Sequence, residues 1–384
     1  MRPRTILYIG NFFFSLCAAL TAYILLPYLS AFMPMAYTGL VISGGALVAL
    51  VLFPLMPELV CRFGIQRIAL VFAFLEMSAL FALAVAPAAV VAPFLIALSV
   101  SLQPLLAYEL DLLLEATVTE EGTTGRVRTL FITAWNFAVL ISPLLMGALL
   151  ANSDAYGRIF LASAAALLPF IVLFTVRRLP TGVPPQLSHL RDTLLCIAHD
   201  RDLAMVTFGH FLLYSFYIWA PLYVPAYLHL VLGISWSNLG WMFSIMLIPY
   251  VLIEYPAGWI ADRMLGDKEL MFAGFLIAGA SLASLSLLSP ATPIAAIVAI
   301  LVCSRVGSSL IESMTEGHFF RRVSERDVNS ISVFRGVWPV ANLIAPVIGS
   351  IILFFGGYQI LFLLTGGFVM LAGAGATLFI RDFR

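Results

Sequence analysis

The stretch GWIADRMLGDK, residues 258–268, places two acids and two bases between two long apolar runs. An earlier stretch of the same length, PELVCRFGIQR at residues 57–67, also separates two apolar runs and has basic residues at the matching positions. The earlier copy carries Cys61 where the later copy carries Asp262. Short charged segments between apolar runs of about 20 residues are typical of turns between membrane-spanning helices.

The composition of the whole chain excludes a water-soluble fold. Of its 384 residues, 62% are hydrophobic and only 10% are charged, whereas about a quarter of the residues in soluble domains are charged. The mean hydropathy is +1.04. Apolar and polar residues do not alternate as they would in the strands of a transmembrane barrel. We therefore expect an all-α polytopic membrane protein.

Apolar runs bounded by Gly, Pro and charged residues predict twelve transmembrane helices. Their approximate ranges are 5–30, 36–60, 66–86, 90–117, 124–150, 157–178, 202–230, 236–260, 268–289, 292–320, 327–354 and 357–380. The one long connection, 179–201, begins with Pro and Gly and then mixes charges with spaced apolar residues. It predicts a cytoplasmic linker with a short amphipathic helix. The linker would join a six-helix bundle over 1–178 to a second over 202–384.

The basic residues predict the orientation of these helices. They gather at the two termini and in every second loop, with Arg158 as the exception. Because cytoplasmic loops of membrane proteins carry an excess of Lys and Arg, both termini are expected in the cytoplasm. We expect a multi-pass protein of a prokaryotic inner membrane. The N-terminal run has no small-residue cleavage site, so we interpret it as the first helix and not as a signal peptide.

The two halves of the chain resemble each other. Glu109 and Glu312 correspond at a separation of 203 residues. The same separation relates Trp135 to Trp338 and Pro143 to Pro346, and the two charged turns correspond at a separation of 201. Repeated halves in a membrane protein are typical of transporters, in which the substrate site lies between the repeats.

Together these features resemble the major facilitator superfamily, over essentially the whole chain. The signature turn of that family, between its second and third helices, reads roughly G-x-x-x-D-R-x-G-R-K, and it is echoed between the eighth and ninth. The later turn of this chain matches the echo at Gly258, Asp262, Arg263 and Lys268, although its second glycine, Gly266, arrives one place late. The earlier turn keeps Arg62, Gly64 and Arg67 but has Pro57 and Cys61 in place of Gly and Asp.

The resemblance implies two six-helix bundles, a central cavity and alternating access to the two sides of the membrane. It names no substrate, because the family transports many kinds of small molecule. The segments ISPLLMG (141–147) and IAPVIGS (344–350) resemble degraded forms of a Gly/Pro motif of proton-coupled exporters. They favour antiport weakly, because Ser142 replaces the expected glycine before Pro143.

The charged turns are candidates for a cytoplasmic gate. By the resemblance, Asp262 and Arg263 would act as a latch that meets Glu316 or His318, with Lys268 in the same turn. Arg62 and Arg67 would face Glu115. Such contacts form in one transport state and break in the other, and together they contribute about 1–3 kcal/mol. The alternative is that these charges only set the topology of the chain.

Ionisable residues deeper in the spans are candidates for proton coupling, because each costs about 2.5–3.5 kcal/mol at mid-helix unless it is paired or functional. The proton carriers predicted are Glu312 and Glu109. Arg305 lies seven residues before Glu312, on the same helix face, and Arg335 lies at a suitable depth in the eleventh helix. A permanent structural salt bridge is the alternative. Weaker candidates are Glu76 and Glu254.

The first and seventh helices line the cavity in this superfamily, so their polar residues are candidates for substrate contacts. These are Asn11, Ser15, His210 and Tyr214, and Arg305 is positioned to meet an anionic group of a substrate. Ordinary hydrogen bonding inside a bundle is the alternative for each of them.

We therefore expect a secondary active transporter, proton-coupled, with export of small organic or amphipathic compounds as the leading version. A proton symporter or uniporter of a small metabolite, and a non-transporting receptor of the same fold, remain open alternatives. The expected partners are a small-molecule substrate, protons and the lipid bilayer, and the expected state is a monomer. With a net charge of zero and no phosphate loop, nucleophile triad or metal-ligand cluster, we expect no nucleic acid, cofactor, metal or enzymatic activity.

Overall fold

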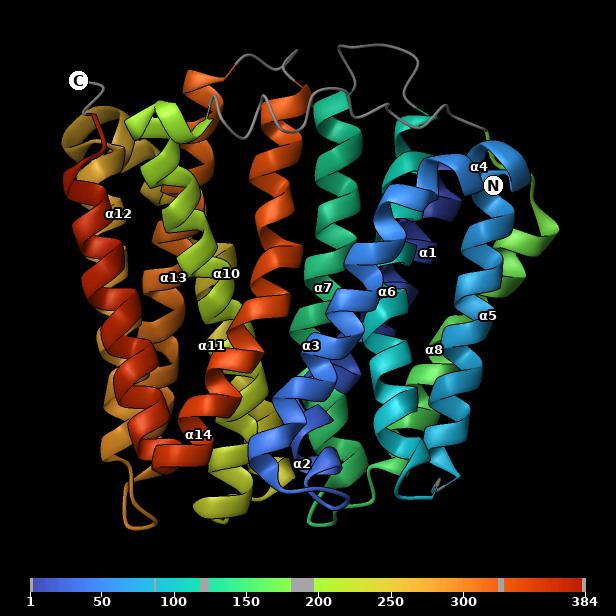
Figure 1. The fold of residues 1–384 in the computed structure, drawn as a ribbon, viewed down its shortest axis with the longest axis horizontal. Helices are drawn as coiled ribbons and strands as arrows, with labels where there is room; N and C mark the ends of the chain where they lie inside the picture. Colours follow the sequence, from blue (N-terminus) through green and yellow to red (C-terminus); the bar gives the residue numbers. More distant parts are fainter. Residues whose placement is uncertain (1–2, 86–87, 118–123, 181–196, 324–327, 382–384) are drawn as a thin grey trace. The chain divides into compact units, whose positions relative to one another are not determined.

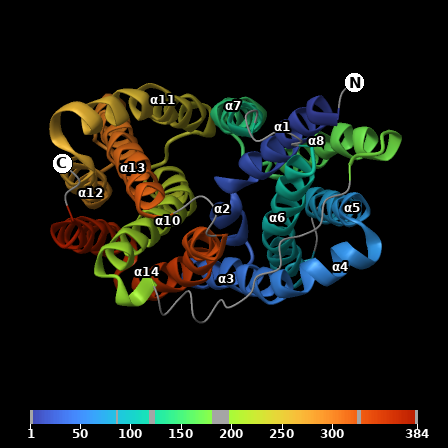
Figure 2. The same ribbon diagram turned by 90° about the horizontal axis from the view of Figure 1, so that it is seen from above.

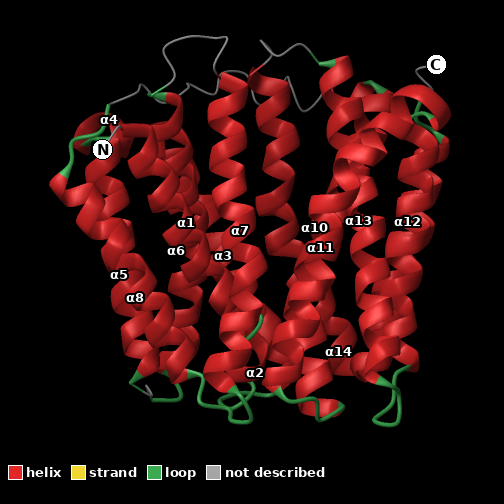
Figure 3. Ribbon diagram, turned by 180° about the vertical axis from the view of Figure 1, so that it is seen from behind, coloured by secondary structure: helices red, strands yellow, loops and turns green. Residues whose placement is uncertain are grey.

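The computed structural model describes residues 3–85, 88–117, 124–180, 197–323 and 328–381. Within these ranges every regular element is helical, as Figures 1 and 3 show. The chain divides into two compact units. The first unit contains residues 1–186 and 234–244, and the second contains residues 187–233 and 245–384.

The first unit is built from long apolar helices that begin and end near Pro, Gly or charged residues. They are α1 (Pro3–Ala22), α2 (Leu25–Leu29), α3 (Met35–Leu52), α4 (Met56–Phe63), α5 (Ile65–Ala84), α6 (Val91–Glu115), α7 (Thr124–Leu150) and α8 (Gly157–Val176). Helix α1 packs against α7 and α8, α5 packs against α6 and α8, and α3 packs against α6 (Figure 2).

The second unit contains α10 (Arg201–Ala226), most of α11 (Trp236–Ile260), α12 (Asp267–Ser284), α13 (Ile294–Arg322) and α14 (Val328–Leu378). Helix α12 packs against α13 and α14, and α10 packs against the same two helices. Small residues allow the close approach of α12 and α13, as is common in membranes. A methyl group added at Gly307 would overlap the backbone nitrogen of Ala278.

Ten helices in the described residues are long and apolar enough to cross a membrane. One of them, Val333–Leu378, is divided by Gly357, whose backbone is not helical (φ 69°, ψ −172°). With that division, and with α11 as a further long helix, the described residues contain the twelve helices predicted. The all-α membrane fold is confirmed. Residues 181–196, and with them most of the predicted amphipathic linker, lie outside the described residues.

The beginning of α11 belongs to the first unit and is held there by hydrogen bonds. The indole nitrogen of Trp236 donates to Asp154 (3.0 Å), and the hydroxyl of Ser244 donates to the carbonyl of Leu140 (3.0 Å). Between them, Gly240 lies so close to α7 that an added methyl group would be 2.7 Å from the carbonyl oxygen of Pro143. In the second unit, the buried indole of Trp219 donates to the carbonyl of Ala345 (2.7 Å).

The internal repeat appears in the backbone of the two charged turns. Gly64, just before α5, has φ 87° and ψ 140°, and Gly266, just before α12, has φ 94° and ψ 164°. The two glycines are 202 residues apart. Only glycine adopts this backbone region readily. The same unusual turn therefore starts the third helix of each half.

Candidate functional site

A cluster of polar side chains lies inside the second unit, where α10, α11 and α13 meet. The hydroxyl of Tyr217 donates to Glu312 Oε2 at 2.6 Å. Arg305 Nη1 donates to the hydroxyl of Tyr250 (3.3 Å), which also shares a hydrogen bond of 2.8 Å with Ser308. We refer to these five residues as the Glu312 cluster. Arg305 and Glu312, seven residues apart on α13, thus contribute to one polar cluster.

Aromatic rings surround the guanidinium of this cluster. Arg305 is only 4% exposed, and its guanidinium carbon lies 5.4 Å from the ring centroid of Phe216 and 6.0 Å from that of Tyr217. A ring face attracts a cation at this distance, most strongly where water is excluded. The guanidinium is therefore held partly by groups that do not change charge.

His210 and Tyr214 lie beside the same cluster, on the same face of α10. His210 is 1% exposed, and its Nδ1 lies 3.3 Å from the hydroxyl of Thr315. Its ring stacks on Phe334, with 4.0 Å between the ring centroids, and meets Tyr214 edge to face. Arg335 is close enough to act electrostatically on both His210 and Tyr214. The imidazole is thus enclosed by its own helix bundle.

Glu316 approaches the same region from α13. It acts electrostatically on Tyr214, as does Glu312. Three of the groups proposed for proton coupling (Glu312, Arg305 and Arg335) therefore lie around one part of the second unit. The fourth, Glu109, belongs to the first unit.

In the first unit, the predicted cavity residues of α1 make hydrogen bonds inside the bundle. Asn11 is 2% exposed, and its amide donates to the carbonyl of Phe131 on α7 (2.8 Å). Ser15 is fully buried and donates to the carbonyl of Asn11 (2.6 Å). These contacts tie α1 to α7.

Glu109, on α6, has a different environment from Glu312. It is fully buried, and neither of its carboxyl oxygens has a hydrogen-bond partner among the described residues. An isolated carboxylate is very costly in such surroundings, and a neutral acid much less so. The geometry is that expected of a carboxyl group that carries a proton.

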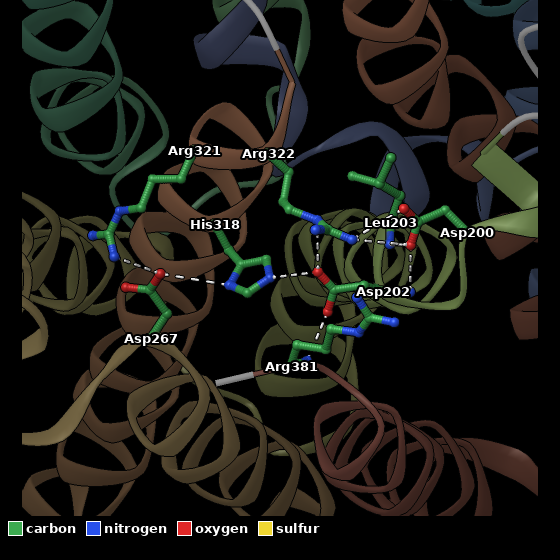
Figure 4. A network of polar contacts seen from close by, with 8 residues as sticks. All are labelled: Asp200, Asp202, Leu203, Asp267, His318, Arg321, Arg322 and Arg381. Carbon is green, nitrogen blue, oxygen red and sulfur yellow. Dashed lines mark hydrogen bonds and ion pairs between the residues drawn. The ribbon is translucent and has the colours of Figure 1, made fainter. Parts of the chain in front are cut away.

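A second group of charges, which we call the ionic network, joins the ends of α10, α12 and α13 (Figure 4). Its centre is His318, whose Nε2 lies 3.1 Å from Asp202 and whose Nδ1 lies 3.5 Å from Asp267. All three side chains are almost completely buried. A neutral imidazole has only one donor, so both carboxylates are satisfied by the imidazolium form.

Two arginines complete the ionic network. Arg321 lies 2.9 Å from Asp267, and Arg322 lies 3.2 Å from Asp202 and 3.0 Å from Asp200. Three carboxylates thus meet two guanidinium groups and one imidazolium, so the charges of the network balance.

Asp200 begins α10 as its N-cap. Its Oδ1 accepts from the backbone N–H groups of Asp202 (3.0 Å) and Leu203 (3.3 Å). Burial acts to raise the pKa of Asp200, but these N–H groups and the guanidinium of Arg322 together hold it below its ordinary value. Asp202 in turn accepts from the backbone N–H of Arg381 (2.7 Å), just beyond the end of α14.

The residues predicted for a gate have other partners within their own units. Lys268 donates to the carbonyl of Leu378 (3.2 Å), Arg263 lies over the ring of Trp259 (5.3 Å), and Arg62 lies over the ring of Phe63 (5.8 Å). The side chains of Arg67 and Glu115 are exposed. The side chain of Asp262 lies outside the described part of the structure.

Sequence reasoning missed several functional candidates. Tyr217 lies one and two turns beyond Tyr214 and His210 on one face of α10, which is a detectable signal. Asp200 is the N-cap of an apolar helix and Asp202 lies in its first turn, and acids in these positions are also a detectable signal. The meeting of Asp267 with His318 has no such signal, because the two residues are 51 positions apart.

The sequence profile of the Major Facilitator Superfamily matches residues 206–383. The matched residues are a little under half of the chain. No curated protein matches the sequence closely enough to count as a relative.

Solved transporters share the fold over the whole chain. The structure is similar to that of the nucleoside transporter NupG, with 13% identity and a TM-score of 0.77 over 99% of this chain and 100% of that one. A bacterial homologue of the human lysosomal transporter Spinster gives 12% identity and a TM-score of 0.76, over 98% and 96% of the two chains. The peptide transporter POT has 15% sequence identity and a TM-score of 0.75, over 97% of this chain and 93% of that one.

Proposed function

We propose that this protein is a secondary transporter of the major facilitator superfamily, a proton-coupled antiporter that exports small organic or amphipathic compounds, with Glu312 as its proton carrier. The observation that carries the proposal is the hydrogen bond of 2.6 Å from Tyr217 to Glu312, on a helix that is long and apolar enough to cross a membrane. A carboxylate is rarely placed at such a position unless it is paired or functional.

The surroundings of Arg305 support a change of charge at Glu312. Removing one charge of a buried pair usually leaves the other without compensation, at high cost. Arg305, however, also has the hydroxyl of Tyr250 and the ring faces of Phe216 and Tyr217. Glu312 can therefore take up a proton while the guanidinium keeps polar and aromatic partners.

Export in exchange for protons is supported by the Gly/Pro segments around Pro143 and Pro346, which resemble a motif of proton-coupled exporters. The cluster itself offers an aromatic lining and one cation. Both are suited to an organic compound with an apolar body.

The test uses purified protein in liposomes, with ethidium and a panel of other amphipathic compounds as probes. An antiporter accumulates a probe when the lumen is acidic, whereas a proton symporter accumulates it when the outside is acidic. Glu312→Gln should abolish accumulation driven by the pH gradient while exchange of probe across the membrane continues. Tyr217→Phe should weaken the accumulation driven by the pH gradient roughly tenfold, since a hydrogen bond to a charged group contributes about 1.5–3 kcal/mol.

The matched control is Glu58→Gln, which removes an exposed carboxylate at the start of α4. It should leave both measurements unchanged. Transport by Glu312→Gln that still follows the pH gradient would show that another group carries the proton.

A further inference from the structure

Glu76, in the middle of α5, is a carboxyl group that the proposed coupling does not use. Its side chain is fully buried. Ser99 donates to Glu76 Oε1 at 2.6 Å, and Gln103 donates to the same oxygen at 3.1 Å. The amide of Gln103 also lies 3.3 Å from the hydroxyl of Ser99. Ser99 and Gln103 are one turn apart on α6, so the three side chains form a closed triangle between two helices.

The second carboxyl oxygen, Glu76 Oε2, is buried and has no hydrogen-bond partner among the described residues. Among the described residues no basic side chain pairs with Glu76, and the basic residue of α5 itself, Arg67, lies nine residues earlier and is exposed. Of the helices packed against α5, α6 contains no basic residue, and α8 contains only Arg158, in its first turn. The basic residue of α4 is Arg62, which is exposed and lies over Phe63.

The other titratable groups near this site are acidic or neutral. The buried thiol of Cys17, on α1, is close enough to Glu76 to interact with it electrostatically. Farther along α6 lie the acids Glu109, Asp111 and Glu115, with Tyr108 beside them. Each of these groups disfavours a negative charge on Glu76 or leaves it unchanged.

The hydrogen bonds fit the neutral acid. In that form Oε1 is the carbonyl oxygen and accepts from Ser99 and Gln103, while Oε2 carries the proton. A full negative charge would instead place Oε2 in an apolar interior with no donor, which is far more costly. We propose that Glu76, held by Ser99 and Gln103, is a proton-binding site of the first unit.

Gln103 gives this proton a route to the surface of the unit. Glu76 and Ser99 are buried, whereas Gln103 is half-buried and covers them. The site belongs to the first unit and Glu312 to the second, so the assignment of Glu76 stands whether or not Glu312 carries the coupling proton.

The test is infrared spectroscopy of the full-length protein in detergent, which detects the carbonyl band of a protonated carboxyl group. Near neutral pH, the difference between the wild type and Glu76→Gln should contain one such band. The band should weaken as the pH rises, and Glu76→Gln should release one proton fewer over that range. Glu312→Gln should leave the band in place, so failure of the coupling proposal and failure of this one are distinguishable.

Ser99→Ala provides a second variant that keeps Glu76. Its carbonyl band should move to higher frequency, because Oε1 loses its shorter hydrogen bond. The absence of a Glu76 band near neutral pH, or a Ser99→Ala spectrum identical to the wild type, would overturn the proposal. Loss of the band when Na⁺ is added at constant pH and ionic strength would also overturn it, in favour of a sodium site.

Discussion

The two units join the start of their first helix to the end of their fourth helix by different chemistry. In the first unit, the guanidinium of Arg4 donates twice to the carbonyl of Thr117, just after α6 (3.3 and 2.8 Å). In the second unit, Asp202 at the start of α10 meets His318 and Arg322 at the end of α13, inside the ionic network. One joint is a pair of hydrogen bonds at a partly buried carbonyl, and the other consists of buried charges.

The turns before α5 and α12 are more alike. Two residues after the positive-φ glycine, Gln66 donates to the carbonyls of Phe174 and Arg177 at the end of α8 (2.5 and 2.6 Å). At the equivalent position Lys268 donates to the carbonyl of Leu378 at the end of α14. Each side chain binds carbonyls that a helix end leaves without partners. The two turns therefore share their backbone geometry and a side chain that binds the end of another helix, but the side chain itself differs.

The largest expected effect comes from breaking the ionic joint. Asp202→Ala removes the acceptor of His318, Arg322 and the backbone of Arg381, and should lower the free energy of unfolding by about 3–5 kcal/mol because it leaves buried charge unpaired. Arg4→Ala, the matched change in the first unit, should cost about 1–2 kcal/mol. Denaturant unfolding of the purified protein in detergent measures both. Equal losses would mean that the two joints are energetically equivalent.

The next effect concerns the shared turn. Gly64→Ala and Gly266→Ala should each cost about 1–3 kcal/mol, because a side chain is strained at these φ and ψ values. Gly44→Ala in α3 is the control, since it has open space around it and an ordinary helical backbone. It should be neutral or stabilise by up to about 1 kcal/mol. A clear difference between the first two variants would contradict the equivalence of the turns.

A smaller effect is expected from the two side chains that hold helix ends. Gln66→Leu removes two donated hydrogen bonds and one accepted from the backbone N–H of Leu179, and should cost about 1–2 kcal/mol. Lys268→Met should cost no more than about 0.5 kcal/mol, because its single bond is exposed to solvent. Thermal unfolding of the two variants side by side measures the difference. A larger loss of stability for Lys268→Met than for Gln66→Leu would contradict this prediction.

The smallest effect is a pH dependence at Asp200. Its pKa is lowered in the folded protein, so its charge stabilises the fold above the pKa of the unfolded chain, and this contribution is lost as the pH falls through the folded pKa. Asp200→Asn keeps an N-cap residue and removes only the charge. The wild type should exceed the variant in stability by less than about 1 kcal/mol near neutral pH, and the gap should close in acid. A gap that persists in acid would exclude this role of the charge.

The sequence was sufficient to predict the helices, because an apolar run of spanning length has few other stable conformations in a membrane. It also predicted the face of α13 that carries Arg305 and Glu312, since helical periodicity depends on one segment alone. The partners Tyr217 and Tyr250 come from other helices, and periodicity does not determine which faces meet. The same reason explains why Asp202 and Asp267 were missed as the partners of His318.

Each unit contains a buried indole whose N–H group is bonded inside that unit, Trp236 to Asp154 and Trp219 to the carbonyl of Ala345. Indole fluorescence shifts to longer wavelength when water reaches the ring. The chain has six tryptophans, and a variant that keeps one of these two and replaces the others with phenylalanine reports on a single unit. A pair of such variants would show by emission colour alone which unit loosens first on heating.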